Sequence, residues 1–118
     1  MRESDRDLTR LHHIQASIRN VMNFMAGRIE EDLSTDAMLF FAVVKNIEII
    51  GEAAYKLTDQ FKDNHPLTPW RPIIKMRHIL THGYYQVSAD EIYSVYKNDL
   101  NDLSIQIEQY IDELTGGN

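Results

Sequence analysis

Apolar residues recur at helical spacing along most of the chain. Between about Asp5 and Ala26 they fall at alternating three- and four-residue steps, which places them on one face of an α-helix: Leu8, Leu11, Ile14, Ile18, Val21, Met22 and Met25. We expect this helix to end at Gly27. The segment that follows, RIEEDLS, is expected to form a polar connection up to a helix cap at Ser34 or Thr35.

A second segment, from Asp36 to about residue 64, is apolar around most of its circumference. This pattern predicts a central helix that contacts its neighbours on several sides. Gly51 lies inside the segment, and glycine costs about 1 kcal/mol relative to alanine within a helix. We therefore expect another helix to approach closely at Gly51. Pro66 ends the segment, since proline disfavours helical geometry in the residue before it.

A third helix is expected to reach Gly83. Thr68 and Pro69 are suited to its cap and first turn. Pro72 lacks an N–H group, which predicts that regular helix begins close to it. Trp70, at the same end, is interpreted as a core residue in preference to a platform for stacking bases.

The last helical segment begins at Ser88, which forms a capping box with Glu91. Apolar residues then continue at helical spacing to Leu114, with a break expected at residues 98 and 99. No hairpin signal or internal repeat interrupts this series. The pattern predicts an all-α fold, an antiparallel bundle of four to five helices, with residues 1–118 forming one domain.

Composition narrows the classes of function. The chain has 118 residues, no cysteine and a formal net charge of −6. The lack of cysteine excludes disulfides and thiolate zinc sites and fits a cytoplasmic protein. No stretch approaches the roughly 20 apolar residues that a membrane span needs. The negative charge opposes nonspecific coating of nucleic acid, so any RNA site has to be a local basic patch.

The segment MRHILTHGYY, residues 76–85, holds the densest group of side chains that can move protons or bind phosphates. It lies in a window, residues 64–89, that contains none of the 18 carboxylates of the chain. Because RNA and DNA are polyanions, the cationic and titratable residues of this window are the candidates for a nucleic-acid site: His65, Arg71, Lys75, Arg77, His78 and His82. We expect Arg71, Lys75 and Tyr85 to bind substrate.

Helix geometry decides which of these residues are neighbours. Arg77 and His82 are five residues apart and therefore point about 140° away from each other around a straight helix. Either the long arginine side chain curls towards His82, or a second copy of the chain completes the site. His78 and His82 are one turn apart and adjacent. No third ligand accompanies the two histidines, so we expect no metal and no other cofactor.

An arginine and a histidine without a carboxylate cluster fit metal-independent cleavage of RNA. In that reaction the 2′-hydroxyl of the RNA attacks the adjacent phosphorus, histidine transfers the proton, and a guanidinium stabilises charge on the phosphoryl oxygens. We therefore expect Arg77, His82 and His78 to be catalytic. Each also has a structural alternative: a capping histidine at 82, a surface histidine at 78, and an ion pair of Arg77 with Glu52, which would also support the arginine.

The segment RHILTHGY, residues 77–84, resembles the signature of the HEPN superfamily in its HepT-like form, with an arginine, a polar residue, a short spacer, a histidine and a tyrosine two residues later. IIGEA, residues 49–53, and PWR, residues 69–71, resemble HepT-like segments at the matching places. The resemblance covers most of the chain. His78 stands where many relatives have asparagine, and Pro72 replaces a usually polar residue.

The resemblance implies a small helical toxin of a type II toxin–antitoxin system. Its homodimer would bring two motifs into one cleft and cleave RNA. It further implies a partner, a MntA-like nucleotidyltransferase antitoxin that transfers AMP to the motif tyrosine, here Tyr84. The alternative is a non-catalytic helical subunit whose role is to bind that nucleotidyltransferase and be AMPylated on Tyr84, which would otherwise be an ordinary loop residue. A helical scaffold without either activity is the third possibility.

Overall fold

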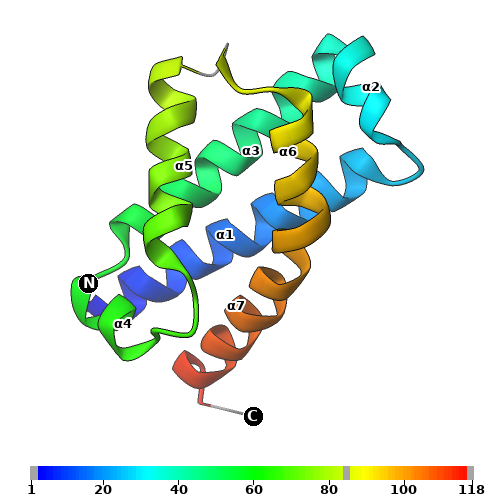
Figure 1. Ribbon diagram of the computed structural model, residues 1–118. Coiled ribbons are helices and arrows are strands. Elements are labelled where there is room, and N and C mark those ends of the chain that lie inside the picture. The colour runs from blue at the N-terminus through cyan, green and yellow to red at the C-terminus, as the bar shows by residue number, and fades with distance from the viewer. Residues whose placement is uncertain (1–2, 84–85, 117–118) are drawn as a thin grey trace.

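The computed structural model describes residues 3–83 and 86–116, and these form helices joined by short connections (Figure 1). The described residues contain no strand, so the predicted all-α class is confirmed. In chain order the helices are α1 (Glu3–Met25), α2 (Glu30–Thr35), α3 (Ala37–Lys56), α4 (Asp59–Asn64), α5 (Trp70–Gly83), α6 (Ala89–Ser94), the π-helical turn η2 (Val95–Asp99) and α7 (Leu100–Leu114).

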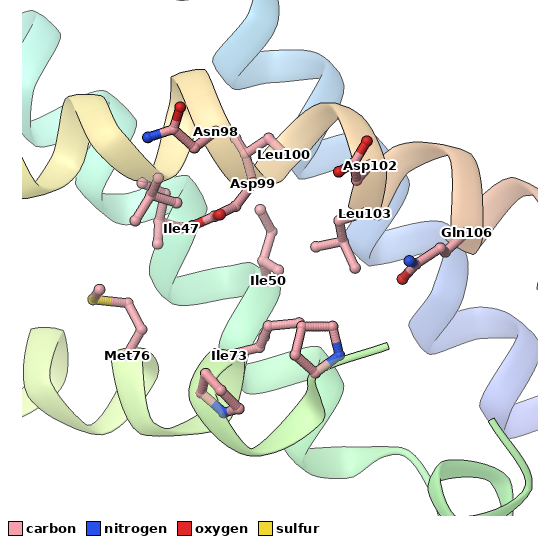
Figure 2. Close-up of a pocket in the computed structure, with 13 residues that line it drawn as sticks. Ile47, Ile50, Ile73, Met76, Asn98, Asp99, Leu100, Asp102, Leu103 and Gln106 are labelled. Atoms are coloured by element: carbon pink, nitrogen blue, oxygen red, sulfur yellow. The ribbon is translucent and has the colours of Figure 1, made fainter. Parts of the chain in front are cut away.

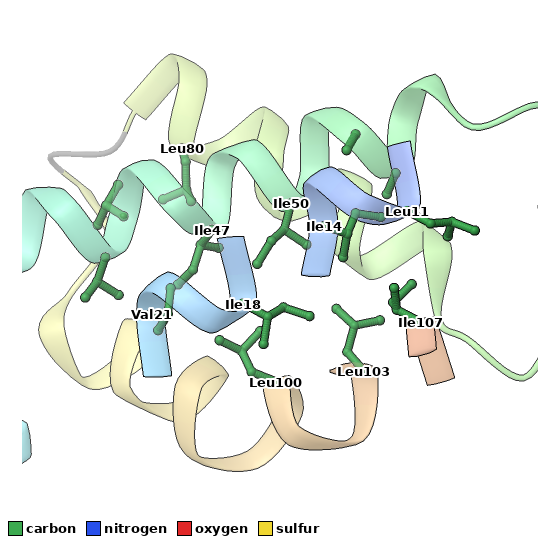
Figure 3. Close-up of a cluster of buried hydrophobic side chains, with 14 of the residues drawn as sticks. Leu11, Ile14, Ile18, Val21, Ile47, Ile50, Leu80, Leu100, Leu103 and Ile107 are labelled. Carbon is green, nitrogen blue, oxygen red and sulfur yellow. The ribbon is translucent and has the colours of Figure 1, made fainter. Parts of the chain in front are cut away.

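The two longest helices, α1 and α3, form the centre of the bundle. They run in opposite directions and pack along their lengths, while α5 lies on α3 and α7 lies on α1 (Figure 1). Apolar side chains from α1, α3, α5 and α7 fill the space between them, including Leu11, Ile14, Ile18, Ile47, Ile50, Leu80, Leu103 and Ile107 (Figure 3). The helical stripe of residues 8–25 is thus the core face of α1, and Gly27, with φ of +74°, follows its end.

The connection predicted over residues 28–34 is wrong, because most of it forms α2. Leu33 anchors this short helix in the core with 3% of its surface exposed, and Asp32 accepts a hydrogen bond from the N–H of Ile29 at 2.9 Å. The cap of the next helix is also one or two residues later than predicted. Asp36, in place of Ser34 or Thr35, accepts a hydrogen bond from the N–H of Leu39 at 3.1 Å.

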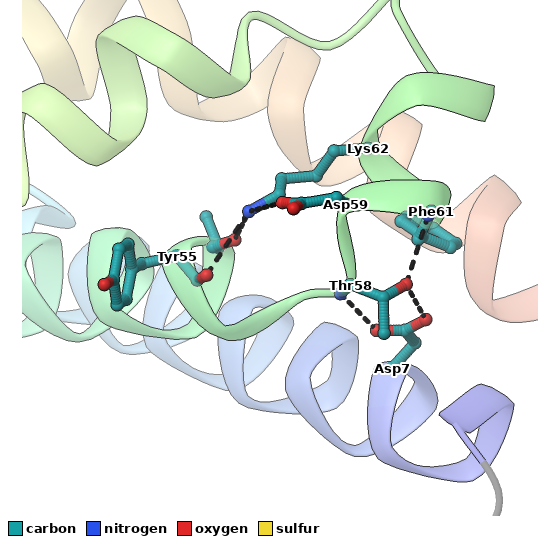
Figure 4. Close-up of polar contacts among 7 residues, drawn as sticks. Asp7, Tyr55, Thr58, Asp59, Phe61 and Lys62 are labelled. Carbon is teal, nitrogen blue, oxygen red and sulfur yellow. Dashed lines mark hydrogen bonds and ion pairs between the residues drawn. The ribbon is translucent and has the colours of Figure 1, made fainter.

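The central segment is two helices, where the apolar pattern predicted one. The break is fixed by a buried carboxylate, Asp7 of α1, which accepts hydrogen bonds from the N–H and the hydroxyl of Thr58 at 2.9 and 2.8 Å (Figure 4). The Thr58 hydroxyl oxygen in turn accepts from the N–H of Phe61 and caps α4. Lys62 donates to the last carbonyls of α3, those of Ala54 and Tyr55. Asp7 and Thr58 are 51 residues apart, so the local pattern could not indicate their contact.

Helix α5 begins at Trp70, and Pro72 lies in its first turn, where a missing N–H leaves no hydrogen bond unmade. Trp70 is 7% exposed and belongs to the core, as predicted. The capping box of Ser88 and Glu91 is present at the start of α6. The break expected at residues 98 and 99 takes the form of the π-helical turn η2. No helix in the described ranges is long and apolar enough to cross a membrane.

Candidate functional site

Helix α5 is positioned by a close approach to α3 at Gly51. A side-chain carbon added to Gly51 would overlap the Cβ of Arg77 and lie 3.0 Å from the carbonyl oxygen of Ile73. Only a glycine therefore allows the two backbones to come this near, which confirms the predicted close contact. As a result, the Cα of Arg77 sits directly against α3.

The Arg77 side chain is held by two residues of α3. Its Nε donates to Oε1 of Glu52 at 2.7 Å, so the ion pair considered from the sequence is present. Its guanidinium carbon lies 4.9 Å from the centre of the Tyr55 ring, a cation–π distance. Among the described residues, the two terminal amino groups of this guanidinium make no hydrogen bond. Tyr55 was not among the residues predicted for the site, although its position three residues after Glu52 places both on one face of α3.

Glu52 carries its charge under most conditions. Partial burial raises the pKa of this carboxyl, but hydrogen bonds and charge from Arg77 and Lys56 outweigh burial and hold the pKa below its ordinary value of 4.5. Lys56 Nζ lies 3.3 Å from Oε2 of Glu52, on the other oxygen from Arg77. The carboxylate thus holds two cations at fixed positions beside α5.

His78 and His82 lie on the exposed surface of α5, with ring centres 4.6 Å apart. Thr81, between them in sequence, donates its hydroxyl to Glu48 of α3 at 3.2 Å. Within the described residues, no hydrogen bond or ring contact joins Arg77 to either histidine. The structure thus brings the two histidines together and leaves Arg77 on the flank of α5 that faces α3.

Arg71 and Lys75 are exposed on the same helix. Tyr84 and Tyr85, for which modification and substrate binding are expected, lie outside the described residues. Glu52 is the supporting residue expected from the sequence, and it contacts Arg77 directly. Among the described residues, no group of three or more histidine, aspartate or glutamate side chains is arranged to hold a metal ion.

A cleft of about 410 Å³ lies on the other side of α5, between this helix, α3 and the η2–α7 segment (Figure 2). Its floor is apolar, with Ile50, Ile73 and Met76, and two carboxylates, Asp99 and Asp102, stand across it from α5. Burial, and then the charge of Asp102, raise the pKa of Asp99. The cleft contains neither Arg77 nor the histidines, so it is separate from the predicted site.

The fold and the site together place this chain among small all-α proteins that carry an arginine and histidines on one helix. The family model described as "Ribonuclease HepT-like" matches residues 14–110, which include the whole motif helix. The chain therefore belongs to the HepT-like ribonuclease family, within the HEPN proteins, as its resemblance implied.

Individual relatives agree with this assignment. A protein of Thermococcus cleftensis named "Probable ribonuclease HepT" is 33% identical over 109 residues, which are 92% of this chain and 97% of that protein. A "Putative RNase" of Caldanaerobacter subterraneus is 30% identical over 103 residues, 87% of this chain and 92% of that protein. A "Gamma-glutamylcyclotransferase and putative RNase" of Methanocaldococcus jannaschii is 34% identical over 104 residues, which are 88% of this chain. The match covers 47% of that relative, so this chain spans about half of its length. No solved structure matches the chain.

Proposed function

We propose that this chain is a metal-independent endoribonuclease that acts as a homodimer. The observation that carries the proposal is the arrangement on α5, where Arg77 is held by Glu52 through Nε alone and two exposed histidines stand one turn apart. A guanidinium fixed in this way retains two amino groups for a phosphate, and an exposed imidazole can transfer protons near neutral pH. The family of the chain and the names of its relatives favour RNA as the substrate.

The proposed reaction needs only the substrate and these side chains. The 2′-oxygen of the RNA forms a bond to the adjacent phosphorus while His82 removes its proton. The bond from phosphorus to the 5′-oxygen breaks, and that oxygen takes a proton from an acid, a role we assign to His78. Arg77 stabilises the charge that develops on the non-bridging oxygens. The products are a 2′,3′-cyclic phosphate and a 5′-hydroxyl.

A second copy of the chain is proposed because one helix does not bring Arg77 and His82 together. The two positions are about 140° apart around α5, and Arg77 is engaged with α3. In a homodimer, Arg77 of one copy and His82 of the other can meet at one phosphate. Two-fold symmetry would then give two such pairs in the same cleft.

Incubation of the purified protein with RNA in the presence of a metal chelator tests the function. Cleavage is expected without added metal, with cyclic phosphate ends, and His82→Ala is expected to abolish it. His13→Ala is the matched control, since His13 is an exposed histidine of α1 away from the motif. A requirement for Mg²⁺, or cleavage that survives His82→Ala, would show that the mechanism is wrong.

The toxin role and the antitoxin partner belong to the same proposal. Tyr84 follows directly on Gly83, the last residue of α5, and is two residues from His82. In the proposed modification, the Tyr84 hydroxyl oxygen attacks the α-phosphorus of ATP, pyrophosphate leaves, and the tyrosine proton is released. The added phosphate would place negative charge beside the motif and oppose binding of RNA.

The intact mass after incubation with ATP, Mg²⁺ and a MntA-like nucleotidyltransferase tests this part of the proposal. We expect the addition of AMP in the wild type and none in Tyr84→Phe. AMP addition to a chain that never cleaves RNA would favour the alternative, a non-catalytic partner subunit.

A further inference from the structure

The cleft between α5, α3 and the η2–α7 segment has no part in the proposed reaction, and its two sides differ in chemistry. The side formed by α5 and α3 is apolar and consists of Ile47, Ile50, Pro72, Ile73 and Met76 (Figure 2). The facing side carries all the polar side chains of the lining: Asn98, Asp99, Asp102 and Gln106. Part of that side is the π-helical turn η2, and such turns often occur at functional sites.

Asp99 and Asp102 give the cleft its charge. They are three residues apart, about one helical turn, and are therefore neighbours on the same surface. Within the described parts of the chain, neither carboxylate makes a hydrogen bond or an ion pair, and no lysine, arginine or histidine lines the cleft. Burial, and then the charge of Asp102, raise the pKa of Asp99. A cation between the two carboxylates would offset this repulsion, whereas a neutral group would leave it in place.

The size and the apolar side of the cleft define the rest of the ligand. Its volume is about 410 Å³, which lies in the lower part of the range of about 300–1,000 Å³ found for small-molecule sites. The apolar side favours an aliphatic body, because each methylene that is buried there strengthens binding by up to about four-fold. A second charged end would have to lie against apolar side chains, which is unfavourable. The ligand is therefore expected to have one cationic end.

From this geometry we propose that the cleft binds a small aliphatic primary amine, with its ammonium group between Asp99 and Asp102. Its carbon chain lies across Ile50, Ile73 and Met76. The three N–H donors of an ammonium group can be shared between the two carboxylates and the side-chain oxygen of Gln106. Because the cleft contains none of the residues assigned to RNA cleavage, the inference does not rest on the proposed function.

Isothermal titration calorimetry of the full chain with n-hexylamine tests the inference. At pH 7 this probe is protonated, as a lysine side chain is. From propylamine to hexylamine, affinity is expected to rise by about two- to four-fold for each added methylene. Hexan-1-ol, which has the same carbon chain without the charge, is expected to bind about ten-fold more weakly than hexylamine. Hexane-1,6-diamine is also expected to bind more weakly, because of its second charge.

Substitutions locate the bound amine. Asp99→Asn and Asp102→Asn are each expected to lower the affinity for hexylamine about three-fold, since these carboxylates are exposed and partly screened. Met76→Trp places a larger side chain in the cleft and is expected to abolish binding. Asp112→Asn and Ile105→Trp are the matched controls, at exposed positions of α7 outside the cleft, and both are expected to bind like the wild type. Circular dichroism of each variant verifies its fold.

Equal affinities for hexylamine and hexan-1-ol, or an affinity that does not depend on chain length, would overturn the inference. Equal losses in Asp99→Asn and Asp112→Asn would also overturn it. Light scattering is expected to give the same mass with and without hexylamine. A fall in mass on binding would mean that a second copy of the chain occupies the cleft, which would contradict the proposed ligand.

The amine site and the proposed function can fail separately. His82→Ala, which is expected to abolish cleavage of RNA, is expected to bind hexylamine like the wild type. If the wild type binds hexylamine but never cleaves RNA, the proposed function fails and the amine site stands. If it cleaves RNA and does not bind hexylamine, the amine site fails and the function stands.

Discussion

Among single residues, Arg77 is the one whose side chain is most clearly held in place by its neighbours. Glu52 accepts from its Nε, and the Tyr55 ring lies against its guanidinium. These contacts restrict a long side chain that would otherwise be free to rotate, which lowers the entropy lost when a phosphate binds. Glu52 and Tyr55 are therefore positioning residues in the proposed reaction, because neither is required to touch the substrate.

The Glu52 interaction predicts a pH dependence of stability. Since the pKa of Glu52 is lowered in the folded chain, its carboxylate stabilises the fold above its unfolded pKa of about 4.5, and this contribution is lost as the pH falls through the folded value. Glu52→Gln is expected to lower the free energy of unfolding at pH 7 by less than about 1 kcal/mol, because the pair is partly exposed and screened. Urea unfolding of both proteins between pH 3 and 7 measures it.

The difference between the wild type and Glu52→Gln is expected to shrink towards pH 3 and with added salt. A difference that grows on acidification would mean that the carboxylate does not act through its charge. Expressed as free energies, the loss of ribonuclease activity in Glu52→Gln is expected to exceed the loss of stability. The reason is that a misplaced guanidinium affects the transition state directly.

At the scale of helices, the contact between α3 and α5 is set by Gly51. Gly51→Ala stabilises the helical conformation of α3 by about 1 kcal/mol, since alanine has the higher helix propensity. It also adds a carbon where Arg77 and the backbone of Ile73 already lie. Overpacking of this kind costs about 1–3 kcal/mol. We expect net destabilisation in urea unfolding and loss of cleavage, because α5 has to move away from α3.

Gly83→Ala is the control for this substitution. A carbon there would meet only the side chain of Gln86, at 3.2 Å, and Gly83 does not have a positive φ. Its stability is expected to be equal to or slightly above that of the wild type. A Gly51→Ala protein as stable and active as the wild type would contradict the close contact.

The break between α3 and α4 depends on the hydroxyl of Thr58. Thr58→Val keeps the shape of the side chain but removes a donor to buried Asp7 and the cap of α4. Loss of such contacts costs about 1–3 kcal/mol. Thr9→Val removes an exposed hydroxyl contact within α1 and is expected to change stability by less than about 0.5 kcal/mol. Equal effects of the two substitutions in urea unfolding would contradict the role of Thr58.

The helices followed from the sequence where the signal was local. The spacing of apolar residues predicted α1 and α7, the capping box at Ser88 predicted the start of α6, and Gly51 predicted a close contact. The break at Thr58 was missed because Asp7, 51 residues earlier, determines it. Helix α2 was missed because a single buried residue, Leu33, anchors a turn of otherwise polar residues.

For the candidate site, the sequence located the motif and its Glu52 partner, but not the full arrangement. Tyr55 was missed because an aromatic residue on a helix face has no specific signature of its own. A single copy of the chain leaves Arg77 and His82 apart, so how the two meet depends on the assembly of copies.

At the scale of the whole molecule, the proposed site is shared between two copies of the chain. A variant that is folded but monomeric is therefore expected to lose most of its activity. For the same reason, specific activity is expected to fall on dilution below the dimer dissociation constant, as light scattering and cleavage assays at matched concentrations would show. Activity independent of concentration across that range would contradict a shared site.

Mixing two inactive variants tests the central claim most directly. Arg77→Ala and His82→Ala are co-refolded at equal amounts so that subunits exchange, and cleavage of RNA is measured in the presence of a chelator. Random pairing makes half of the dimers mixed. If each site takes Arg77 from one copy and His82 from the other, one of the two sites in every mixed dimer is intact. About a quarter of wild-type activity is therefore expected. If the mixture is as inactive as its components, Arg77 and His82 do not act across the dimer.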